Sequence, residues 1–371
     1  MSTQFSLSSN ISYDDPISFE CDTSYDSGLE LLKYIIQVTL LSINFILNFL
    51  IIRVTMFSKN NDFRENSFFI IYAADLIMGM YMSLSEILVG RLFIYVTLLC
   101  PILAPYFFTP SIFLKIFFTL SHYSQGFKTV SQVFLSFNRM TCVVFPVGYS
   151  AIWKRILTPI IIVLFVLPIG IIWNVLISRV YANPSFGGFS VNYIKLVSWA
   201  SLSKLHLTYF IVSLILIIVI SGVYLYALLI LKHRIKSAEQ TLTIATMVLS
   251  LEFSFLSVIQ IYFAFFSSST SEWRPFLLRV MYFTYDLLNF STTIIFISCN
   301  PKLRKMLLKR MQSSVTVGRY VFLTGYEVNL HKLLSNGRLS IEKPAENAEN
   351  TKKKSTSNST IPVRIIPALI H

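Results

Sequence analysis

The stretch SIFLKIFFTLSHYSQGFKTVSQVFLSFNRMTCVVF, residues 111–145, decides the fold. At about 1.5 Å per residue, a helix of this length crosses a bilayer core of about 30 Å with turns to spare. At about 100° per residue, one half of this helix is polar and the other apolar. The polar half holds Ser121, Ser124, Gln125, Lys128, Ser131, Gln132, Ser136 and Arg139, and the apolar half holds Tyr123, Val130, Val133, Phe134 and Phe137. A spanning helix cannot turn polar side chains to lipid, so we expect this stripe to face other helices or a water-filled cavity.

The composition of the 371-residue chain indicates an integral membrane protein. Hydrophobic residues make up 54% of it, charged residues only 13%, and the mean hydropathy is +0.64. The polar first 20 residues lack the apolar stretch of a cleaved signal peptide, so the first span would direct insertion. A net charge of +13 is typical of nucleic-acid or anionic-membrane partners, but 13 of the 31 Lys and Arg residues follow Pro301. Membrane topology explains most of this charge, and we expect no nucleic-acid partner.

Seven apolar runs of about 20 or more residues predict seven transmembrane helices, an all-α membrane protein. They cover roughly residues 34–56, 68–90, 112–145, 156–177, 207–231, 242–266 and 280–299. A further apolar run at residues 92–109 is interrupted by Pro101 and Pro105 and closed by Pro110. Proline breaks helices, so we interpret this run as a folded loop over the membrane surface and not as an eighth span.

The distribution of lysine and arginine predicts that the N-terminus lies outside. Fourteen of these residues fall on one side of the membrane, namely Arg53, Lys59, Arg64, Arg139, Lys154, Arg155, Lys232, Arg234, Lys236, Lys302, Arg304, Lys305, Lys309 and Arg310. The other side has eight, namely Lys33, Arg91, Lys115, Arg179, Lys195, Lys204, Arg274 and Arg279. The richer side is cytoplasmic, and a glycosylation sequon at Asn10 agrees with this orientation.

Three regions follow from this topology. Residues 1–30 form an acidic extracellular N-terminus, and residues 31–311 form a seven-transmembrane domain. At its end, residues 302–311 place Leu303, Met306, Leu307 and Met311 on one face, which predicts a short amphipathic eighth helix on the inner leaflet. Residues 312–371 form a cytoplasmic tail that is rich in Asn, Ser, Lys, Thr and Glu from about Gly337 and is expected to be largely disordered.

The motifs of enzymes and of metal or cofactor sites are missing from the sequence, so we expect no enzyme, no metal and no cofactor. What remains is a set of charges within the spans, Asp75, Glu86, Lys128, Glu252 and Asp286, with Arg139 at the inner edge. A charge buried in a membrane span costs at least about 2.5 to 3.5 kcal/mol, so partners are expected for each of them.

Lys128 allows two interpretations. It forms a structural ion pair with Asp75, Glu252 or Asp286, or it forms the floor of an outward-open cavity and attracts a ligand carboxylate or another anion. The residues that we expect at such a ligand site are Lys128, His122, Tyr123, Gln125 and Asp286. Aromatic side chains near the outer face also serve plain packing, which is the alternative for Tyr123.

Arg139 also allows two interpretations. Its side chain extends to lipid phosphates, or it is a switch, held at rest by an acidic partner and freed to engage a cytosolic protein. Glu239, at the start of the sixth span, is the carboxylate that we pair with it. The surface expected to contact that protein comprises Asn138, Arg139, Lys154, Arg155, Lys232 and Arg234.

The four cysteines leave one plausible disulfide. Cys21 and Cys100 are predicted to be extracellular, whereas Cys142 and Cys299 lie at the reducing inner edge, and residues 178–206 contain no cysteine. We therefore expect Cys21 to pair with Cys100 and to tether the N-terminus over the mouth of the cavity.

Several short motifs resemble those of one family. RLFIY at 91–95, LCP at 99–101, SFNRMTCVVFP at 136–146, Tyr149 and IWK at 152–154 are similar to the nematode serpentine receptor class gamma chemoreceptors. The resemblance covers about residues 20–311. It implies a G protein-coupled receptor that detects small molecules, couples to a heterotrimeric G protein and lies in the plasma membrane of sensory neurons or their cilia. Compared with the wider rhodopsin-like superfamily, Asn138 replaces the acidic residue that normally precedes the arginine.

Two other classes of membrane protein were weighed. A ligand-gated ion channel of the chemosensory type would place its N-terminus inside, whereas the charge bias predicts the reverse. A transporter would favour internally repeated halves with helices broken at matching positions, and Pro168 in the fourth span has no obvious mate.

Overall fold

The computed structural model describes residues 15–57, 63, 65–197, 199–231, 236–266, 273–299 and 303–308. Asn10, Lys232, Arg234, the side chain of Glu239 and the chain beyond residue 308 lie outside the described residues, so the predictions made for them stay predictions. The chain divides into two units, Met1–Leu307 and Leu308–His371, and the helices and strands named below belong to the first.

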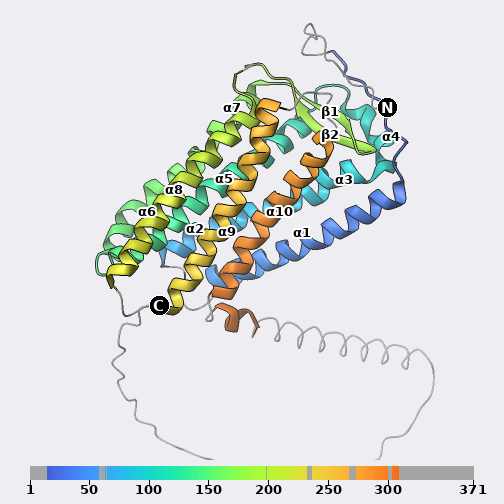
Figure 1. Cartoon of the computed structure of the whole chain (residues 1–371). Coiled ribbons are helices and arrows are strands. Elements are labelled where there is room, and N and C mark those ends of the chain that lie inside the picture. Colours follow the sequence, from blue (N-terminus) through green and yellow to red (C-terminus); the bar gives the residue numbers. More distant parts are fainter. Residues whose placement is uncertain are drawn as a thin grey trace, which may run out of the picture. The chain divides into compact units, whose positions relative to one another are not determined.

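The described chain is mostly helical (Figure 1). The long helices are α1 (Ser27–Met56), α2 (Ser67–Ser85), α5 (Ile112–Val144), α6 (Tyr149–Val166), α8 (Leu202–Leu231), α9 (Lys236–Ile261) and α10 (Trp273–Cys299). The shorter helices are η1 (Glu86–Gly90), α3 (Arg91–Tyr95), η2 (Thr97–Leu99), α4 (Cys100–Leu103), η3 (Ala104–Phe107), α7 (Ile169–Ile177) and η4 (Tyr262–Phe266). Two strands, β1 (Val180–Ser185) and β2 (Gly188–Tyr193), complete the unit.

The prediction of a helical protein with multiple membrane spans is confirmed. Six segments of the described chain are long and apolar enough to cross a membrane. The second of them continues from α2 through η1 and α3, and the third joins α6 to α7. α5 meets the same test only together with Thr97–Phe107, from which it is bent by 114°. Its buried polar stripe lowers its hydropathy and gives it a central place in the bundle.

Local chemistry sets several helix boundaries. Asp26 caps α1 by accepting hydrogen bonds from the backbone N–H groups of Gly28 and Leu29, and Asn66 caps α2 through the N–H of Phe68. These side chains satisfy N–H groups that have no partner inside the helix. Pro168 separates α6 from α7, because proline has no N–H to donate and crowds the preceding turn.

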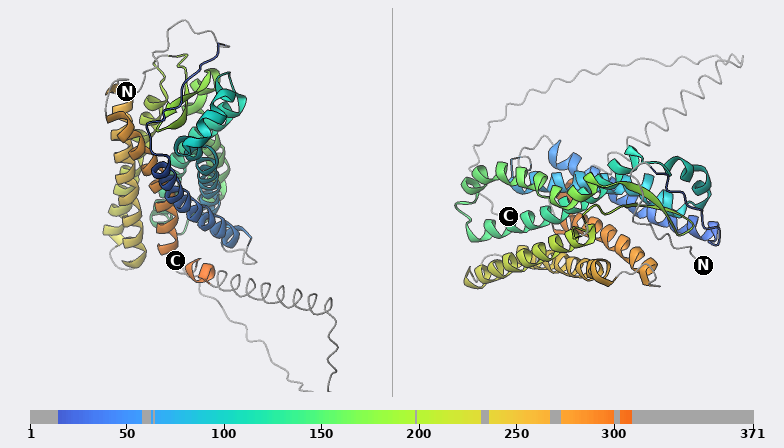
Figure 2. Two further views of the ribbon diagram at one scale, coloured as in Figure 1. Left: turned by 90° about the vertical axis from the view of Figure 1, so that its right-hand side faces the viewer. Right: turned by 90° about the horizontal axis from the view of Figure 1, so that it is seen from above.

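A β-hairpin closes one end of the bundle, which we call the hairpin end (Figures 1 and 2). β1 and β2 pair antiparallel from Val180↔Tyr193 to Ser185↔Gly188. The two residues between the strands, Phe186 and Gly187, have φ angles of 54° and 82°, the left-handed pair that a tight hairpin turn requires. The all-α prediction missed this element.

Residues 97–109 form short helical turns at the hairpin end, as the interpretation of this run as a folded loop predicts, whereas residues 92–95 belong to α3, which continues the second span. Cys100, at the start of α4, forms a disulfide with Cys21, and the backbone N–H of Ile17 donates to Phe108 O over 2.8 Å. The described part of the N-terminal segment is thus fixed to this loop. Phe19, Phe93 and Phe189 bring the segment, α3 and the hairpin into one apolar cluster.

α5 lies among α2, α6, α7 and α8. Every residue that we placed on its polar stripe is buried except Arg139, which is half-buried. Val130 was assigned to the outward half but is buried as well, because α6 covers that side of the helix.

Residues 303–308 are helical, as the amphipathic pattern predicts. Leu303 and Leu307 are buried in the core cluster that contains Ile51 and Val54 of α1. In the described residues, Leu303 and Leu307 therefore pack on the protein, and the expectation that the helix lies on the inner leaflet stays a prediction.

Candidate functional site

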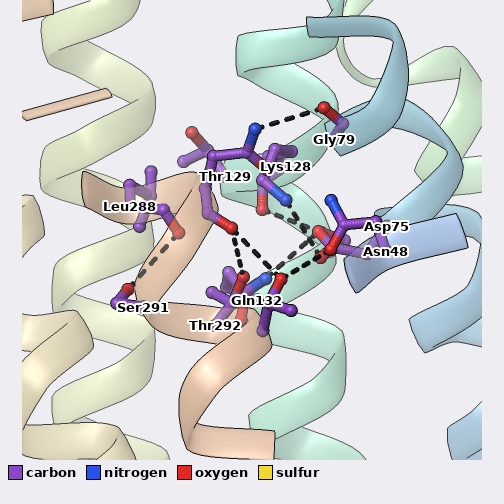
Figure 3. A network of polar contacts seen from close by, with 12 residues as sticks. Asn48, Asp75, Gly79, Lys128, Thr129, Gln132, Leu288, Ser291 and Thr292 are labelled. Carbon is purple, nitrogen blue, oxygen red and sulfur yellow. Dashed lines mark hydrogen bonds and ion pairs between the residues drawn. The ribbon is translucent and has the colours of Figure 1, made fainter. Parts of the chain in front are cut away.

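A buried ion pair stands at the centre of the bundle (Figure 3). Lys128 Nζ of α5 lies 3.1 Å from Asp75 Oδ2 of α2, and the whole Lys128 residue is only 1% exposed. The other oxygen of Asp75 accepts a hydrogen bond from Gln132 Nε2 over 3.1 Å and one from the Ser131 hydroxyl. Of the partners predicted for Lys128, the structure selects Asp75. This carboxylate already holds an ammonium group supplied by its own chain.

Gly79, one turn after Asp75 on α2, lets further polar side chains approach this pair. Asn289 Nδ2 of α10 donates to Gly79 O over 3.1 Å and to Ser83 Oγ over 3.2 Å. A Cβ atom on Gly79 would lie 2.5 Å from Asn289 Oδ1, 3.1 Å from Asn48 Nδ2 and 3.2 Å from Lys128 Nζ. α1, α2, α5 and α10 therefore meet here through polar groups. We call Asn48, Asp75, Lys128, Ser131, Gln132, Asn289 and Thr293 the buried polar network.

A pocket opens between this network and the hairpin end. Its lining comes from α1, α2, η1, α3, α5 and α10 and comprises Leu41, Met82, Ser83, Glu86, Arg91, Gln125, Tyr282, Tyr285, Asp286 and Asn289. We call it the hairpin-side pocket. Its empty space, with open solvent at the mouth included, is about 280 Å³. The enclosed space that a water-sized sphere can reach is only about 10 Å³, so a ligand larger than a water molecule requires the lining side chains to move.

Arg91 is the cationic group of this pocket. Its Nη2 lies 2.9 Å from Asp286 Oδ2, its Nε lies 3.2 Å from Glu86 Oε2, and its Cζ lies 4.5 Å from the centre of the Tyr282 ring. The residue is only 2% exposed. The π-helical turn η1 explains how Glu86 and Arg91 come to face each other, because the Arg91 N–H donates to the carbonyl five residues back.

Gln125 connects the pocket to the half-buried His122 and, through it, to the buried His206. Its Oε1 lies 3.1 Å from His122 Nδ1, and that nitrogen lies 3.2 Å from His206 Nε2 of α8. Gln125 lines the pocket, whereas His122 lies behind it. The hydroxyl of Tyr123 donates to Phe165 O of α6 over 2.8 Å. Tyr123 thus packs toward α6, as its packing alternative supposes.

Of the five residues expected at a ligand site, Gln125 and Asp286 line the hairpin-side pocket, whereas Lys128, His122 and Tyr123 do not. Lys128 does not line the hairpin-side pocket, because its ammonium is held by Asp75 on the far side of Gly79. Asp286 does line the pocket, but its partner is Arg91 and not Lys128. In the sequence, Arg91 stands out only as a loop charge, and Tyr282 and Asn289 do not stand out at all. The five-residue spacing of Glu86 and Arg91 is one signal that could have drawn attention to Arg91.

A second pocket lies around Arg139, and we call it the Arg139 pocket. It is lined by Phe68, Tyr72, Gln132, Leu135, Ser136, Arg139, Leu249, Thr292, Ile295 and Phe296. The Cζ atom of Arg139 lies 4.5 Å from the centre of the Phe68 ring, which stacks on Phe296 of α10 at 5.6 Å. An aromatic face is therefore one of the groups that hold this arginine.

Residues of the SFNRMTCVVFP block around Arg139 link α5 to its neighbours. Asn138 Nδ2 donates to Ser67 Oγ of α2 over 3.0 Å, and Tyr149 of α6 donates to Asn138 Oδ1 over 3.0 Å. Trp153 Nε1 donates to Thr141 Oγ1 over 2.8 Å. Asn138 of α5 thus forms hydrogen bonds with both α2 and α6. The nearby Lys154 and Arg155 are exposed.

Glu252 of α9 is buried but does not bind Lys128. Its Oε2 accepts a hydrogen bond from Ser291 Oγ of α10 over 3.1 Å. This hydrogen bond therefore joins α9 to α10.

The sequence of residues 34–307 matches the family described as Srg family chemoreceptor. This chain belongs to the Srg family. It is 90% identical over the full length of both chains to serpentine receptor class gamma-13 of Caenorhabditis elegans. It is also 44% identical to serpentine receptor class gamma-10 of the same nematode, over 84% of this chain and 95% of that relative. Class gamma-20 is likewise 44% identical, over 82% of this chain and 88% of the relative.

Membership of the Srg family confirms the resemblance seen in the sequence. The chain is a serpentine chemoreceptor with multiple membrane spans, and its relatives are named as receptors and not as enzymes.

Proposed function

We propose that this Srg receptor binds a small molecule in the hairpin-side pocket and signals to a heterotrimeric G protein through the Arg139 pocket. One observation carries the proposal. The buried polar network has a member in each pocket, since Asn289 lines the hairpin-side pocket and Gln132 lines the Arg139 pocket. Between them lie the Asp75–Lys128 ion pair and Gly79.

The mechanism follows from how tightly this network is packed. A ligand that contacts Tyr282 or Asp286 shifts α10, and Asn289 moves with it. Asn289 binds Gly79 O, so the shift changes the fit between α10 and α2 beside Lys128. Phe296, on the same helix, stacks on Phe68 beneath Arg139, so the movement also releases the guanidinium. Packed interfaces of this kind switch between discrete arrangements.

The orientation belongs to the same proposal. With the hairpin end outside, the disulfide Cys21–Cys100 lies in an oxidising compartment, and the exposed Lys154 and Arg155 lie in the cytosol near Arg139. The family supports a membrane location, and we propose the plasma membrane of sensory neurons or their cilia as the site of action.

A G protein dissociation assay in cells tests the function. The tagged receptor is challenged with fractionated nematode small molecules, and Arg139→Ala is compared with the wild-type protein. Arg53→Ala is the matched control, because Arg53 is an exposed arginine at the end of α1. We expect a response that Arg139→Ala abolishes and Arg53→Ala keeps. A whole-cell current that survives G protein blockade would contradict the proposal and favour the ligand-gated channel.

A further inference from the structure

We infer that the hairpin-side pocket recognises a protonated primary amine, whose ammonium group binds between Glu86, Asp286 and Asn289. The inference rests on the proposed function and names the ligand chemistry of that site. It replaces the expectation of an anionic ligand, which depended on Lys128 facing the cavity. Lys128 is instead held by Asp75 and does not line the pocket.

The charges that line the pocket do not balance. The pocket lining contains two carboxylates, Glu86 and Asp286, and Arg91 is its one cationic side chain. With these groups ionised, one negative charge remains uncompensated in a low-dielectric setting. Charge in a membrane interior requires a partner, so the pocket favours a cation over an anion.

Two oxygen atoms at the pocket accept no hydrogen bond from the described residues. Glu86 Oε2 lies 3.2 Å from Arg91 Nε but makes no hydrogen bond with it or with any other described residue. Asn289 Oδ1 also has no hydrogen-bond partner among them, and this residue is only 2% exposed. A buried acceptor without a donor costs free energy, so these two oxygens are positions at which a donor from a ligand or a water molecule would bind.

An ammonium group matches this arrangement better than the alternatives. It carries three N–H donors and no acceptor, whereas a carboxylate carries acceptors only. A carboxylate ligand would gain one contact with Arg91 but would face Glu86 and Asp286 across the same small pocket. An alcohol would supply one donor and leave the charge unbalanced. The rings of Tyr282 and Tyr285 complete a wall against which the carbon part of an amine can pack.

The test measures direct binding and does not depend on signalling. The full-length receptor is purified in lipid nanodiscs, and its thermal unfolding is followed with phenethylamine, its trimethylammonium derivative, phenylacetate and phenethyl alcohol. We expect phenethylamine to bind at least about tenfold more tightly than the other three, since a hydrogen bond to a charged group is worth about one to two powers of ten in affinity. The trimethylammonium probe keeps the charge but has no N–H, so it separates hydrogen bonding from charge alone.

Variants locate the site. Glu86→Gln and Asp286→Asn should each weaken phenethylamine binding about tenfold, whereas Glu20→Gln, an exposed carboxylate in the N-terminal segment, should leave it unchanged. If the pocket variants do not fold, the order of affinity of the four probes for the wild-type receptor still tests the inference. Tighter binding of phenylacetate, equal binding of the trimethylammonium probe or no binding of phenethylamine overturns the inference. Amine binding without G protein dissociation would support the inference and count against the proposed coupling.

Discussion

Gly79 is the residue at which the least change should have the largest effect. A methyl group there would crowd Asn289, Asn48 and Lys128, which are all buried. Alanine improves helix propensity by about 1 kcal/mol, but overpacking costs about 1–3 kcal/mol, so we expect Gly79→Ala to lower thermal stability in detergent or nanodiscs.

The control for Gly79→Ala is Gly222→Ala. Gly222 also lies in a long helix, but beyond its own helix backbone no described residue lies within 4 Å of the position that its Cβ would take. This variant should be neutral or slightly stabilising. Equal effects of the two substitutions on thermal stability would show that the close approach of side chains to Gly79 does not affect stability.

The Asp75–Lys128 pair should behave as a buried ion pair. Removing one partner leaves a charge without compensation and costs about 3–5 kcal/mol, so Lys128→Met should lower the unfolding temperature strongly. The double variant Lys128→Met with Asp75→Asn should recover most of that loss, because a neutral amide can still accept from Ser131. A double variant as unstable as the single one would mean that packing around Lys128, and not its charge, is what matters.

The sequence predicted which charges lie in the membrane but not how they pair. Lys128, Asp75, Glu252 and Asp286 stood out because each is costly in a span. Three carboxylates were then available to one lysine, and spacing along the chain cannot decide between helices that pack only in the folded state. Arg91 escaped notice because its position at the end of a span looks like an ordinary loop charge. Only the π-helical turn brings it beside Glu86.

At the scale of elements, the disulfide should hold the N-terminal segment on the hairpin end. Cys21 and Cys100 are 79 residues apart in sequence, and Ile17 and Phe19 pack beside the same loop. Cys21→Ser should lower thermal stability and speed hydrogen exchange in β1 and β2, because Phe19 contacts Phe189 of the hairpin.

The control for the disulfide is Cys142→Ser, which changes the exposed free cysteine of α5. It should leave both measurements unchanged. Unchanged exchange in the hairpin of Cys21→Ser would show that the apolar contacts of Phe19 suffice and that the tether is dispensable there.

Elements differ in how far a sequence can predict them. Long apolar runs predict spans well, because the bilayer imposes one length and one polarity. The stripe on α5 predicted its central position for the same reason. The β1–β2 hairpin gave no comparable signal in the sequence. Its strands are only six residues long, and its turn places a phenylalanine, Phe186, in the left-handed region that glycine or asparagine usually occupies. Its register depends on the packing of Val180, Ala182 and Phe189 in an apolar cluster whose other residues come from distant parts of the chain.

At the scale of the whole molecule, the two pockets and the network between them form one path along α2, α5 and α10. Each of these helices contributes to both pockets. A ligand at the hairpin end and a protein at the Arg139 end would therefore act on the same three helices. Coupling between the two pockets then requires only that α10 can pack against α2 and α5 in two alternative arrangements.

Orientation is the prediction on which this path depends. The fourteen-to-eight charge bias predicts the N-terminus outside. An epitope tag fused to Met1 should therefore bind antibody on intact cells, and a tag after His371 should bind only after permeabilisation. Glycosidase should shift the gel mobility of the wild-type receptor but not that of Asn10→Gln, because the sequon would carry a glycan only outside the cytosol. A tag at Met1 that is reached only after permeabilisation would invert the bundle. The Arg139 pocket would then face away from any cytosolic G protein, and the ligand-gated channel would become the better explanation.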